Sequence, residues 1–233
     1  MTTFVLVHGA WAGSFCFRHV RRRLQREGHE VFTPSLTGVG ERVHLVSPDV
    51  DLTTHVRDVV NQILYEDLTE IVLLGYSYGG AVVTGCLKHV AERVSHLVYL
   101  DAFVPSDGQS IADIVGAPEP PISLGVEALV PPLLREFDDP AEAEFVAARR
   151  VPQPVGTLFE PVKLTQALEA FPLSRTYIRA TGAGPDEPGN AHFAVAAAHA
   201  RASDEWSCHD IDTNHMVLSN RPDELADVLL NIV

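Results

Sequence analysis

The segment Ile71-Val72-Leu73-Leu74-Gly75-Tyr76-Ser77-Tyr78-Gly79-Gly80 joins an apolar run to a stretch of helical periodicity through a serine flanked by glycines. It matches the pattern Gly-x-Ser-x-Gly, in which the serine sits on a tight, strained turn between a strand and a helix. Side chains at the glycine positions would collide with neighbouring backbone. The bare pattern also arises by chance in loops, but the strand before it and the helix after it argue against chance. Ser77 is therefore the candidate nucleophile.

Apolar runs rich in Val, Leu and Ile alternate with amphipathic stretches on both sides of Ser77. This alternation is typical of an α/β fold, here a mostly parallel six-stranded sheet with helices on both faces. The expected strands are Phe4–Val7, Glu30–Thr33, Ile71–Leu74, Leu97–Leu100, Thr176–Arg179 and Trp206–Ile211. The expected helices are Phe15–Glu27, Leu52–Leu64 with Thr53 or Thr54 as N-cap, Ser77–Glu92 and a last one after Pro222.

Residues Pro105–Pro172 break this rhythm, because they hold many of the chain's 16 prolines and no run that suits the sheet. Two pieces, Leu129–Phe137 and Glu142–Arg149, have helical character, and the prolines limit helices there to short lengths. We expect a small helical cap over the sheet. The chain has 233 residues, of which 46% are hydrophobic. It suits a single domain over residues 1–233, with the cap inserted at about 106–172.

Composition and charge exclude several classes of protein. With 31 acidic and 17 basic residues, the net charge of −14 would repel a phosphate backbone, so no nucleic-acid partner is expected. The cysteines Cys16, Cys86 and Cys208 form no Cys-x-x-Cys pair, which argues against a disulfide framework or a zinc site. No apolar run approaches the ~20 residues that cross a bilayer, and the N-terminus lacks a signal-peptide pattern. We expect a cytoplasmic protein with no membrane partner, and both a monomer and a homodimer stay open.

The first expected strand leads into His8-Gly9-Ala10-Trp11, where this architecture supplies one donor of an oxyanion hole. The other donor directly follows the nucleophile. We therefore expect the backbone N–H groups of Ala10 and Tyr78 to hold the negative charge that develops during acyl transfer. His8 itself is expected to be structural, with its ring bonded to nearby backbone.

A serine hydroxyl needs a base, and histidine has an ordinary pKa close to neutral pH. In this chain order the base lies between the last strand and the last helix, which is the place of His215. His209 is the nearest rival, but strand alternation would hold it within the last strand. Most other histidines are expected to be solvated, on helices or linkers. The acidic and histidine residues at 209–215 match no metal-ligand spacing, so no metal site is expected.

Two carboxylates stand at strand ends that suit the acid orienting His215. Asp186 lies in the loop after the fifth strand, the usual place in this architecture, but some way beyond the strand end. Asp101 ends the fourth strand directly, between apolar neighbours. An isolated buried carboxylate there would be costly without a partner such as His215. These observations favour Asp101 and leave Asp186 as the alternative.

The chain resembles the small α/β-hydrolases related to plant methyl-ester esterases and hydroxynitrile lyases, and bacterial esterases of the same build. The resemblance spans nearly the whole chain and rests on Phe4–Trp11, Gly28–Val31, Leu36–Gly40, Gly75–Gly80, Leu97–Pro105 and His215 with the helix after it. It implies an α/β-hydrolase fold with a helical cap, an apolar pocket and no cofactor. The family often carries its acid soon after the fifth strand, where this chain has Gly182, Ala183 and Gly184, and often has a small apolar residue at position 101.

The resemblance implies a serine hydrolase that cleaves a small apolar or aromatic carboxylic ester, or a lactone, through an acyl-enzyme. The related lyases use a threonine beside the oxyanion loop and a lysine soon after the histidine. This chain has His8-Gly9-Ala10 and His215-Met216-Val217 instead, so cyanohydrin cleavage is the weaker alternative. Ser77 argues against relatives that attack with aspartate. A ligand-sensing receptor that keeps the same residues is another alternative.

Pocket walls are expected from aromatic residues near Ser77 and from apolar residues of the cap. Plain core packing is the competing interpretation for each of them. The candidates are Trp11, Phe15, Phe103, Leu124, Val126, Leu129 and Leu133. Basic residues are scarce in the cap, which gives no sign of a strongly anionic acyl group.

Overall fold

A parallel sheet forms the centre of the molecule, of which the computed structural model describes residues 1–118 and 128–232. The sheet has the order β2-β1-β3-β4-β7-β8, and every neighbouring pair is parallel. Its strands are β1 (Thr3–Val7), β2 (Glu30–Phe32), β3 (Ile71–Tyr76), β4 (Val94–Leu100), β7 (Ser174–Ala180) and β8 (Trp206–Ile211). The six expected strands are confirmed, with small shifts at their ends.

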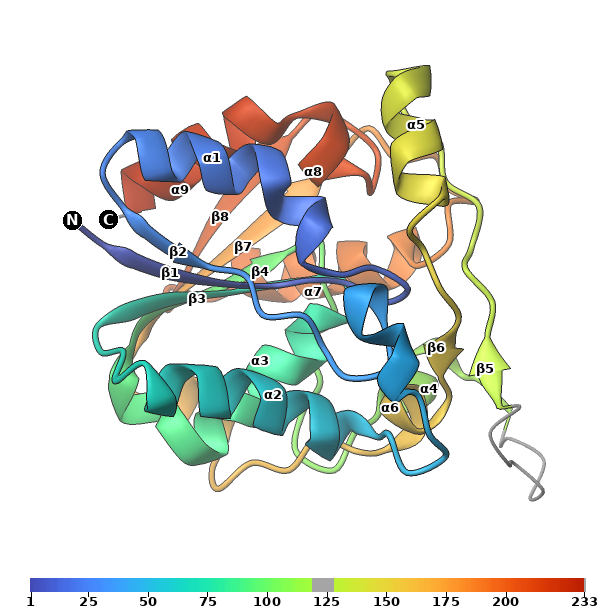
Figure 1. The fold of residues 1–233 in the computed structure, drawn as a ribbon. Coiled ribbons are helices and arrows are strands. Elements are labelled where there is room, and N and C mark those ends of the chain that lie inside the picture. The colour runs from blue at the N-terminus through green and yellow to red at the C-terminus, as the bar shows by residue number, and fades with distance from the viewer. Residues whose placement is uncertain (119–127, 233) are drawn as a thin grey trace.

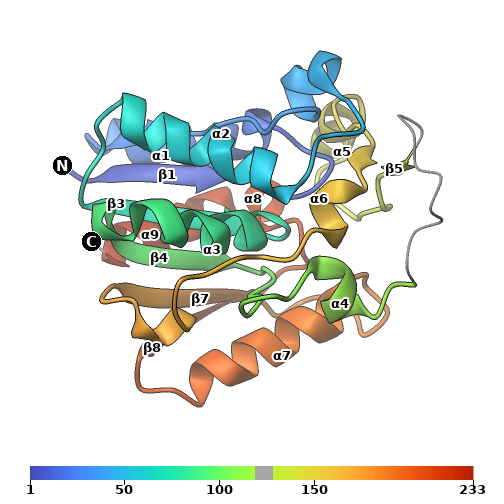
Figure 2. The ribbon, with the colours of Figure 1, turned by 90° about the horizontal axis from the view of Figure 1, so that it is seen from below.

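Helices cover both faces of this sheet (Figure 1, Figure 2). One face carries α1 (Arg18–Arg26) and α9 (Pro222–Ile232), and the other carries α2 (Leu52–Tyr65), α3 (Gly79–Val90) and α7 (Asn190–Arg201). Side chains alternate along each strand. Phe4 and Leu6 of β1 therefore join the core beneath α1 and α9, while Val5 and Val7 join the core beneath α2 and α3. The predicted α/β architecture is confirmed.

The segment 106–172 adds no strand to the main sheet in its described part. Its elements are α4 (Ile111–Val115), β5 (Leu129–Val130), α5 (Pro140–Ala147), β6 (Gln153–Pro154), α6 (Gly156–Phe159) and η4 (Leu168–Ala170). Strands β5 and β6 pair with each other in antiparallel fashion. Together with α5 they stand on the right in Figure 1, beyond the carboxyl ends of the main strands. The segment therefore lies where it can cover residues at those strand ends.

Two local expectations were wrong. The helix expected over 129–137 is absent, because β5 is followed by Pro131 and Pro132 and the residues up to 137 form no regular element. The N-cap of α2 is neither Thr53 nor Thr54. Asp51 caps this helix, and its Oδ1 accepts a hydrogen bond of 2.8 Å from the Thr54 N–H.

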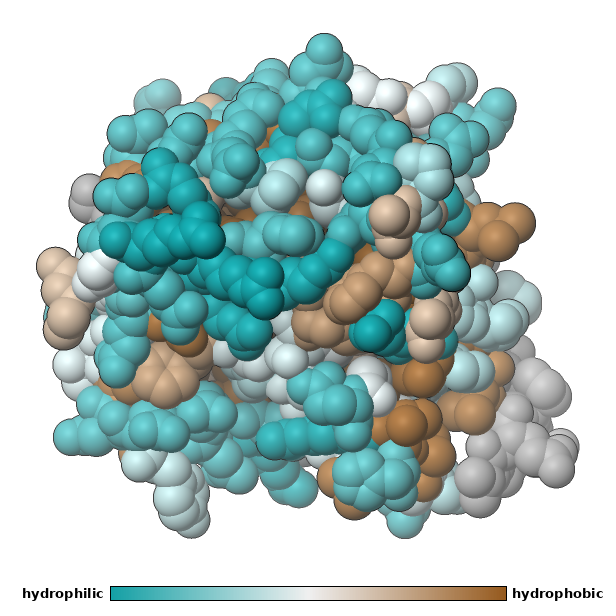
Figure 3. Space-filling view, turned by 45° about the horizontal axis from the view of Figure 1, so that its top comes forward, coloured by the Kyte–Doolittle hydropathy of each residue, from teal (hydrophilic) through white to brown (hydrophobic). Residues whose placement is uncertain are grey.

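Short helical turns complete the fold. They are η1 (Ser14–Phe17), η2 (Gly40–Leu45), η3 (Ala91–Arg93) and α8 (Val217–Asn220). The face seen in Figure 3 is mostly hydrophilic, and its apolar residues gather mainly on the side where the cap lies in Figure 1. Exposed large apolar side chains include Leu133, Leu134, Val43 and Leu45. Within residues 1–118 and 128–232, no helix has the length and apolar character to span a membrane.

Candidate active site

Ser77 lies in the turn between β3 and α3. Its φ angle is +56°, in the left-handed region that residues other than glycine rarely adopt. Its N–H donates to the Leu100 carbonyl (3.1 Å), and its carbonyl accepts from the Phe103 N–H (3.2 Å), so the turn is anchored to the end of β4. At Gly79 an added Cβ would lie 2.5 Å from the Val7 carbonyl oxygen. The start of α3 thus packs directly against the end of β1, which explains this glycine.

His215 lies between Ser77 and Asp101. Its Nε2 is 3.0 Å from Ser77 Oγ, and its Nδ1 is 2.6 Å from Asp101 Oδ2. All three residues are buried, and Asp101 is completely inaccessible. Asp186 is exposed in the loop between β7 and α7, and it has no hydrogen bond to the described part of the chain. The structure therefore brings the first-ranked acid, and not the alternative, to His215.

The Asp101 carboxylate uses its second oxygen as well. Its Oδ1 accepts from the Arg179 guanidinium and from the Ala180 N–H (3.2 Å), both on β7, the strand next to β4. Arg179 in turn bonds the Asn190 side chain at the start of α7. A buried carboxylate is stable only when its charge and hydrogen-bonding capacity are satisfied. The ion pair with Arg179 and the bond to His215 together meet that need.

Two aromatic rings confine the His215 imidazole. Tyr76 stacks on it at a centroid distance of 5.0 Å, and Phe193 stacks on it at 4.8 Å with an interplanar angle of 8°. The Tyr76 hydroxyl also donates to the His215 carbonyl (2.7 Å). These contacts restrict the ring to the plane that joins Ser77 and Asp101. Sequence analysis missed both aromatic neighbours.

Burial sets the protonation of His215. It lowers the pKa of the imidazole from its ordinary value, while the hydrogen bond and the charge of Asp101 act in the opposite direction. The net shift of the pKa is downward. A base has to be neutral before it can accept the serine proton. The structure therefore keeps His215 neutral to a lower pH than a solvated histidine.

The acid limb of kcat/KM against pH is accordingly expected to have its inflection below about 6.5, the ordinary histidine value. As the pH falls, activity persists through that value and is lost only when His215 becomes protonated. Steady-state kinetics on a non-ionising ester substrate measure this inflection. An inflection at or above the ordinary value would contradict the expectation.

Two backbone N–H groups beside Ser77 have no hydrogen-bond acceptor in the described part of the chain. Neither the Ala10 N–H nor the Tyr78 N–H donates a hydrogen bond within the described residues, and both residues line a cavity with Ser77. The two loops are in close contact, because an added Cβ on Gly9 would lie 3.0 Å from Ser77 Cβ. The Tyr78 hydroxyl points away and bonds His55 Nδ1 (2.8 Å). Only the main chain of Tyr78 is therefore available to an oxyanion.

Buried histidines away from Ser77 have structural contacts. His8 Nδ1 donates to the Gly9 carbonyl (2.8 Å), its Nε2 accepts from the Leu36 N–H (3.1 Å), and burial lowers its pKa to about 4. His55 is also buried, unlike the solvated position expected of most other histidines, and burial lowers its pKa to about 3. In residues 1–118 and 128–232, no cluster of three or more His, Cys, Asp or Glu side chains could hold a metal ion.

Two cavities meet at Ser77 and share Ala10, Trp11 and Arg135. The larger, of about 390 Å³, has a mainly apolar wall that includes Phe103, Ile111, Val115, Val130, Leu133, Leu158, Phe159 and Phe193. The smaller, of about 40 Å³, is lined by Phe15, Cys16, Tyr76, Val146, Arg150, His215, Met216 and Leu218, among others. A substrate bound at Ser77 thus meets one large apolar space and one small, more polar space.

The expected wall residues divide between these cavities. Trp11 lines both, Phe15 lines the small one, and Phe103 and Leu133 line the large one. Leu129 lies in β5 but not in the described wall of either cavity. The candidates Leu124 and Val126 lie outside the described residues.

Although basic residues are scarce in the cap, two of them lie at the site. The side chain of Arg135 lines both cavities and is only 5% exposed. Arg150 lines the small cavity and lies over the Trp11 ring. Neither position follows a recognisable pattern in the sequence, because both depend on how the irregular parts of the cap fold back over Ser77.

Comparisons with known proteins agree with this fold. A family model described as "Alpha/beta hydrolase family" matches residues 4–228. A carbendazim hydrolyzing esterase of Nocardioides sp. (strain SG-4G) is 37% identical over 98% of each chain. Methylesterase 1 of Arabidopsis thaliana is 30% identical over 46% of this chain and 41% of its own length. A solved extracellular alpha/beta-hydrolase from a Paenibacillus species has a TM-score of 0.75 and 25% identity, covering 99% of this chain and 98% of its own.

Proposed function

Because the chain belongs to the alpha/beta hydrolase family and is an enzyme of the carboxylesterase type, we propose that it hydrolyses methyl or similarly short alkyl esters of apolar or aromatic acids. The reaction passes through an acyl-enzyme on Ser77, with His215 as base and Asp101 as the acid that orients it. One observation carries this proposal: hydrogen bonds run from Asp101 through His215 to Ser77 at the junction of two unequal cavities.

In the acylation step, Ser77 Oγ attacks the ester carbonyl carbon and His215 Nε2 takes the hydroxyl proton. The carbonyl electrons move to the oxygen, and the N–H groups of Ala10 and Tyr78 hydrogen-bond the resulting oxyanion. One such donor is typically worth about 3–4 kcal/mol of transition-state stabilisation. When the oxyanion collapses, the bond to the alcohol oxygen breaks and His215 gives that oxygen its proton.

In the deacylation step, water takes the place of the alcohol. His215 removes a proton from this water while the water oxygen attacks the acyl carbon. The same two N–H groups hold the second oxyanion. Collapse breaks the bond to Ser77 Oγ and returns the proton to it. Throughout, Asp101 stabilises the imidazolium and keeps Nδ1 as the protonated nitrogen of the neutral ring.

The cavity walls support one placement of the two halves of the ester. The leaving alcohol receives its proton from His215, so we place it on the side of the small cavity, which His215 and Met216 line. A water molecule needs roughly 10–15 Å³ of cavity volume, and the 40 Å³ of this cavity therefore suits a methyl or ethyl group. The acyl group then occupies the apolar cavity of about 390 Å³. The name of Methylesterase 1 among the relatives supports a short alcohol.

The segment 106–172 takes part in this division as a cap on a single domain of residues 1–233. Leu133 and Phe159 come from this segment and line the acyl cavity, while Val146 of α5 lines the alcohol cavity. The cap, rather than the sheet, therefore contributes much of the wall that selects the ester.

A panel of esters tests the proposal. One aromatic acid is presented as its methyl, ethyl, isopropyl and benzyl esters, and a second series joins methanol to acids of increasing size. We expect kcat/KM to fall about tenfold or more between the methyl and isopropyl esters, and to change much less along the acid series. The variant Val146→Ala enlarges the alcohol cavity and should narrow the difference between alcohols.

A selectivity that follows acid size instead of alcohol size would contradict this assignment. Ligand binding without turnover of any ester or lactone would instead support the receptor alternative. The variant Val195→Ala is the matched control, because Val195 is 70% exposed on α7 and lines neither cavity at Ser77.

A further inference from the structure

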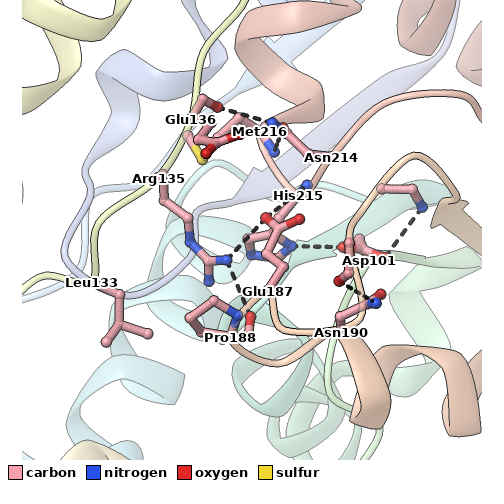
Figure 4. Close-up of polar contacts among 12 residues, drawn as sticks. Asp101, Leu133, Arg135, Glu136, Glu187, Pro188, Asn190, Asn214, His215 and Met216 are labelled. Atoms are coloured by element: carbon pink, nitrogen blue, oxygen red, sulfur yellow. Dashed lines mark hydrogen bonds and ion pairs between the residues drawn. The ribbon is translucent and has the colours of Figure 1, made fainter.

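Glu187 joins the backbone of His215 to the cap. Its Oε1 accepts a hydrogen bond of 3.2 Å from the His215 N–H and one of 3.1 Å from Arg135 Nη1. The same Arg135 nitrogen also donates to the Pro188 carbonyl (3.1 Å). Figure 4 shows the Arg135 guanidinium, the Glu187 carboxylate and the His215 backbone side by side. The side chains of Glu187 and Arg135 are 16% and 5% exposed, so water screens their charges only weakly.

Three segments distant in sequence converge on this carboxylate. Arg135 follows β5 in the cap, Glu187 lies between β7 and α7, and His215 follows β8. A second contact joins two of these segments directly, because the Asn214 side chain donates to the Glu136 carbonyl (3.0 Å). The loop that carries the base is thus attached to the cap on two sides.

We propose that Glu187 is a positioning residue for His215, and that Arg135 links this function to the seating of the cap over Ser77. The inference rests on the proposed function, since it concerns the base of that reaction. A backbone N–H removed from water requires an acceptor, and the Glu187 carboxylate supplies it. Arg135 orients the Glu187 carboxylate and also lines both substrate cavities. Arg135 therefore connects the place where the ester binds to the residue that positions His215.

The charges around His215 give this proposal a specific signature. In the described residues, the titratable and charged groups around the imidazole include Asp101 directly after β4 with Arg179 of β7, Tyr76 of β3, Ser77, Glu187 and Arg135. The negative charge of Glu187 favours the imidazolium, and the positive charge of Arg135 disfavours it. Removing one charge or the other should therefore move the pKa of His215 in opposite directions.

Three variants separate the hydrogen bond from the charge. Glu187→Ala removes both, and we expect kcat to fall about tenfold to a hundredfold, with a smaller change in KM. Glu187→Gln keeps an acceptor, so kcat should fall only a few-fold, while the acid-limb pKa of kcat/KM moves down by a few tenths of a pH unit. Arg135→Gln should move that pKa up by a similar amount. Thermal unfolding of each variant checks that it folds.

Arg221→Gln is the matched control, because Arg221, just before α9, forms a more exposed ion pair with Asp138 of the same cap segment. It should leave kcat and the pH profile unchanged. Wild-type kcat in Glu187→Ala, or pKa shifts of the same sign in Glu187→Gln and Arg135→Gln, would overturn the inference. If Glu187→Ala does not fold, the signs of the pKa shifts in Glu187→Gln and Arg135→Gln decide the test. If the wild-type enzyme hydrolyses no ester, that result contradicts the proposed function and not the role of Glu187.

Discussion

Replacing Asp101 with asparagine is expected to lower kcat about ten-thousandfold. Asparagine keeps the shape of the side chain but presents no negative charge to the imidazolium, and its amide can bind the wrong tautomer of His215. The matched control is Asp186→Asn, which changes an exposed carboxylate and should leave kcat near that of the wild type. Initial rates on the methyl ester of an aromatic acid measure both effects.

Stability needs separate control in this experiment, because Asp101 also pairs with buried Arg179. Breaking a buried ion pair from one side costs about 3–5 kcal/mol of folding free energy. The double variant Asp101→Asn/Arg179→Gln removes the unpaired cation, so it should recover thermal stability without recovering activity. A loss of more than a hundredfold in Asp186→Asn, with Asp101→Asn still active, would contradict the assignment of the acid.

Replacing Ser77 with alanine is expected to lower kcat about a millionfold, since a serine nucleophile and its base act as one unit. The hydroxyl bonds His215, and its loss leaves the turn and the cavities in place. Ser95→Ala is the control, because Ser95 lies in β4 and its hydroxyl bonds the Ile71 carbonyl, far along the sheet from the turn. Progress curves at high enzyme concentration measure the residual activity of Ser77→Ala. An activity within a hundredfold of the wild type would contradict the role of Ser77.

The sheet and the positions of Ser77 and His215 could be predicted because each depends on a local pattern. Strands such as β3 are continuous apolar runs, since both of their faces are buried. The turn at Ser77 needs glycines where other backbone approaches, and this need is visible in the sequence. His215 could be placed from its position between the last strand and the last helix. The acid could only be predicted as Asp101 ahead of Asp186, because the choice between them depends on packing between β4 and β7.

The irregular cap could not be predicted in the same way. Helical periodicity between 129 and 137 competes with Pro131 and Pro132, and the prolines decide the outcome. Arg135 and Glu187 come together through contacts between loops, so no spacing in the sequence predicts this ion pair. Arg179 did leave a signal, because a charged residue inside an apolar strand requires a buried partner. Asp101 directly follows the neighbouring strand, and that pairing would have strengthened the choice of acid.

Labelling by an organophosphonate identifies the nucleophile, since the phosphonate forms a stable bond to an activated serine in the way that an ester forms the acyl-enzyme. The intact protein is weighed after reaction, and its peptides are sequenced by tandem mass spectrometry. We expect one phosphonyl group per chain, attached to Ser77, and no labelling of Ser77→Ala. A label on any other residue, or an unlabelled protein that still hydrolyses esters, would contradict it.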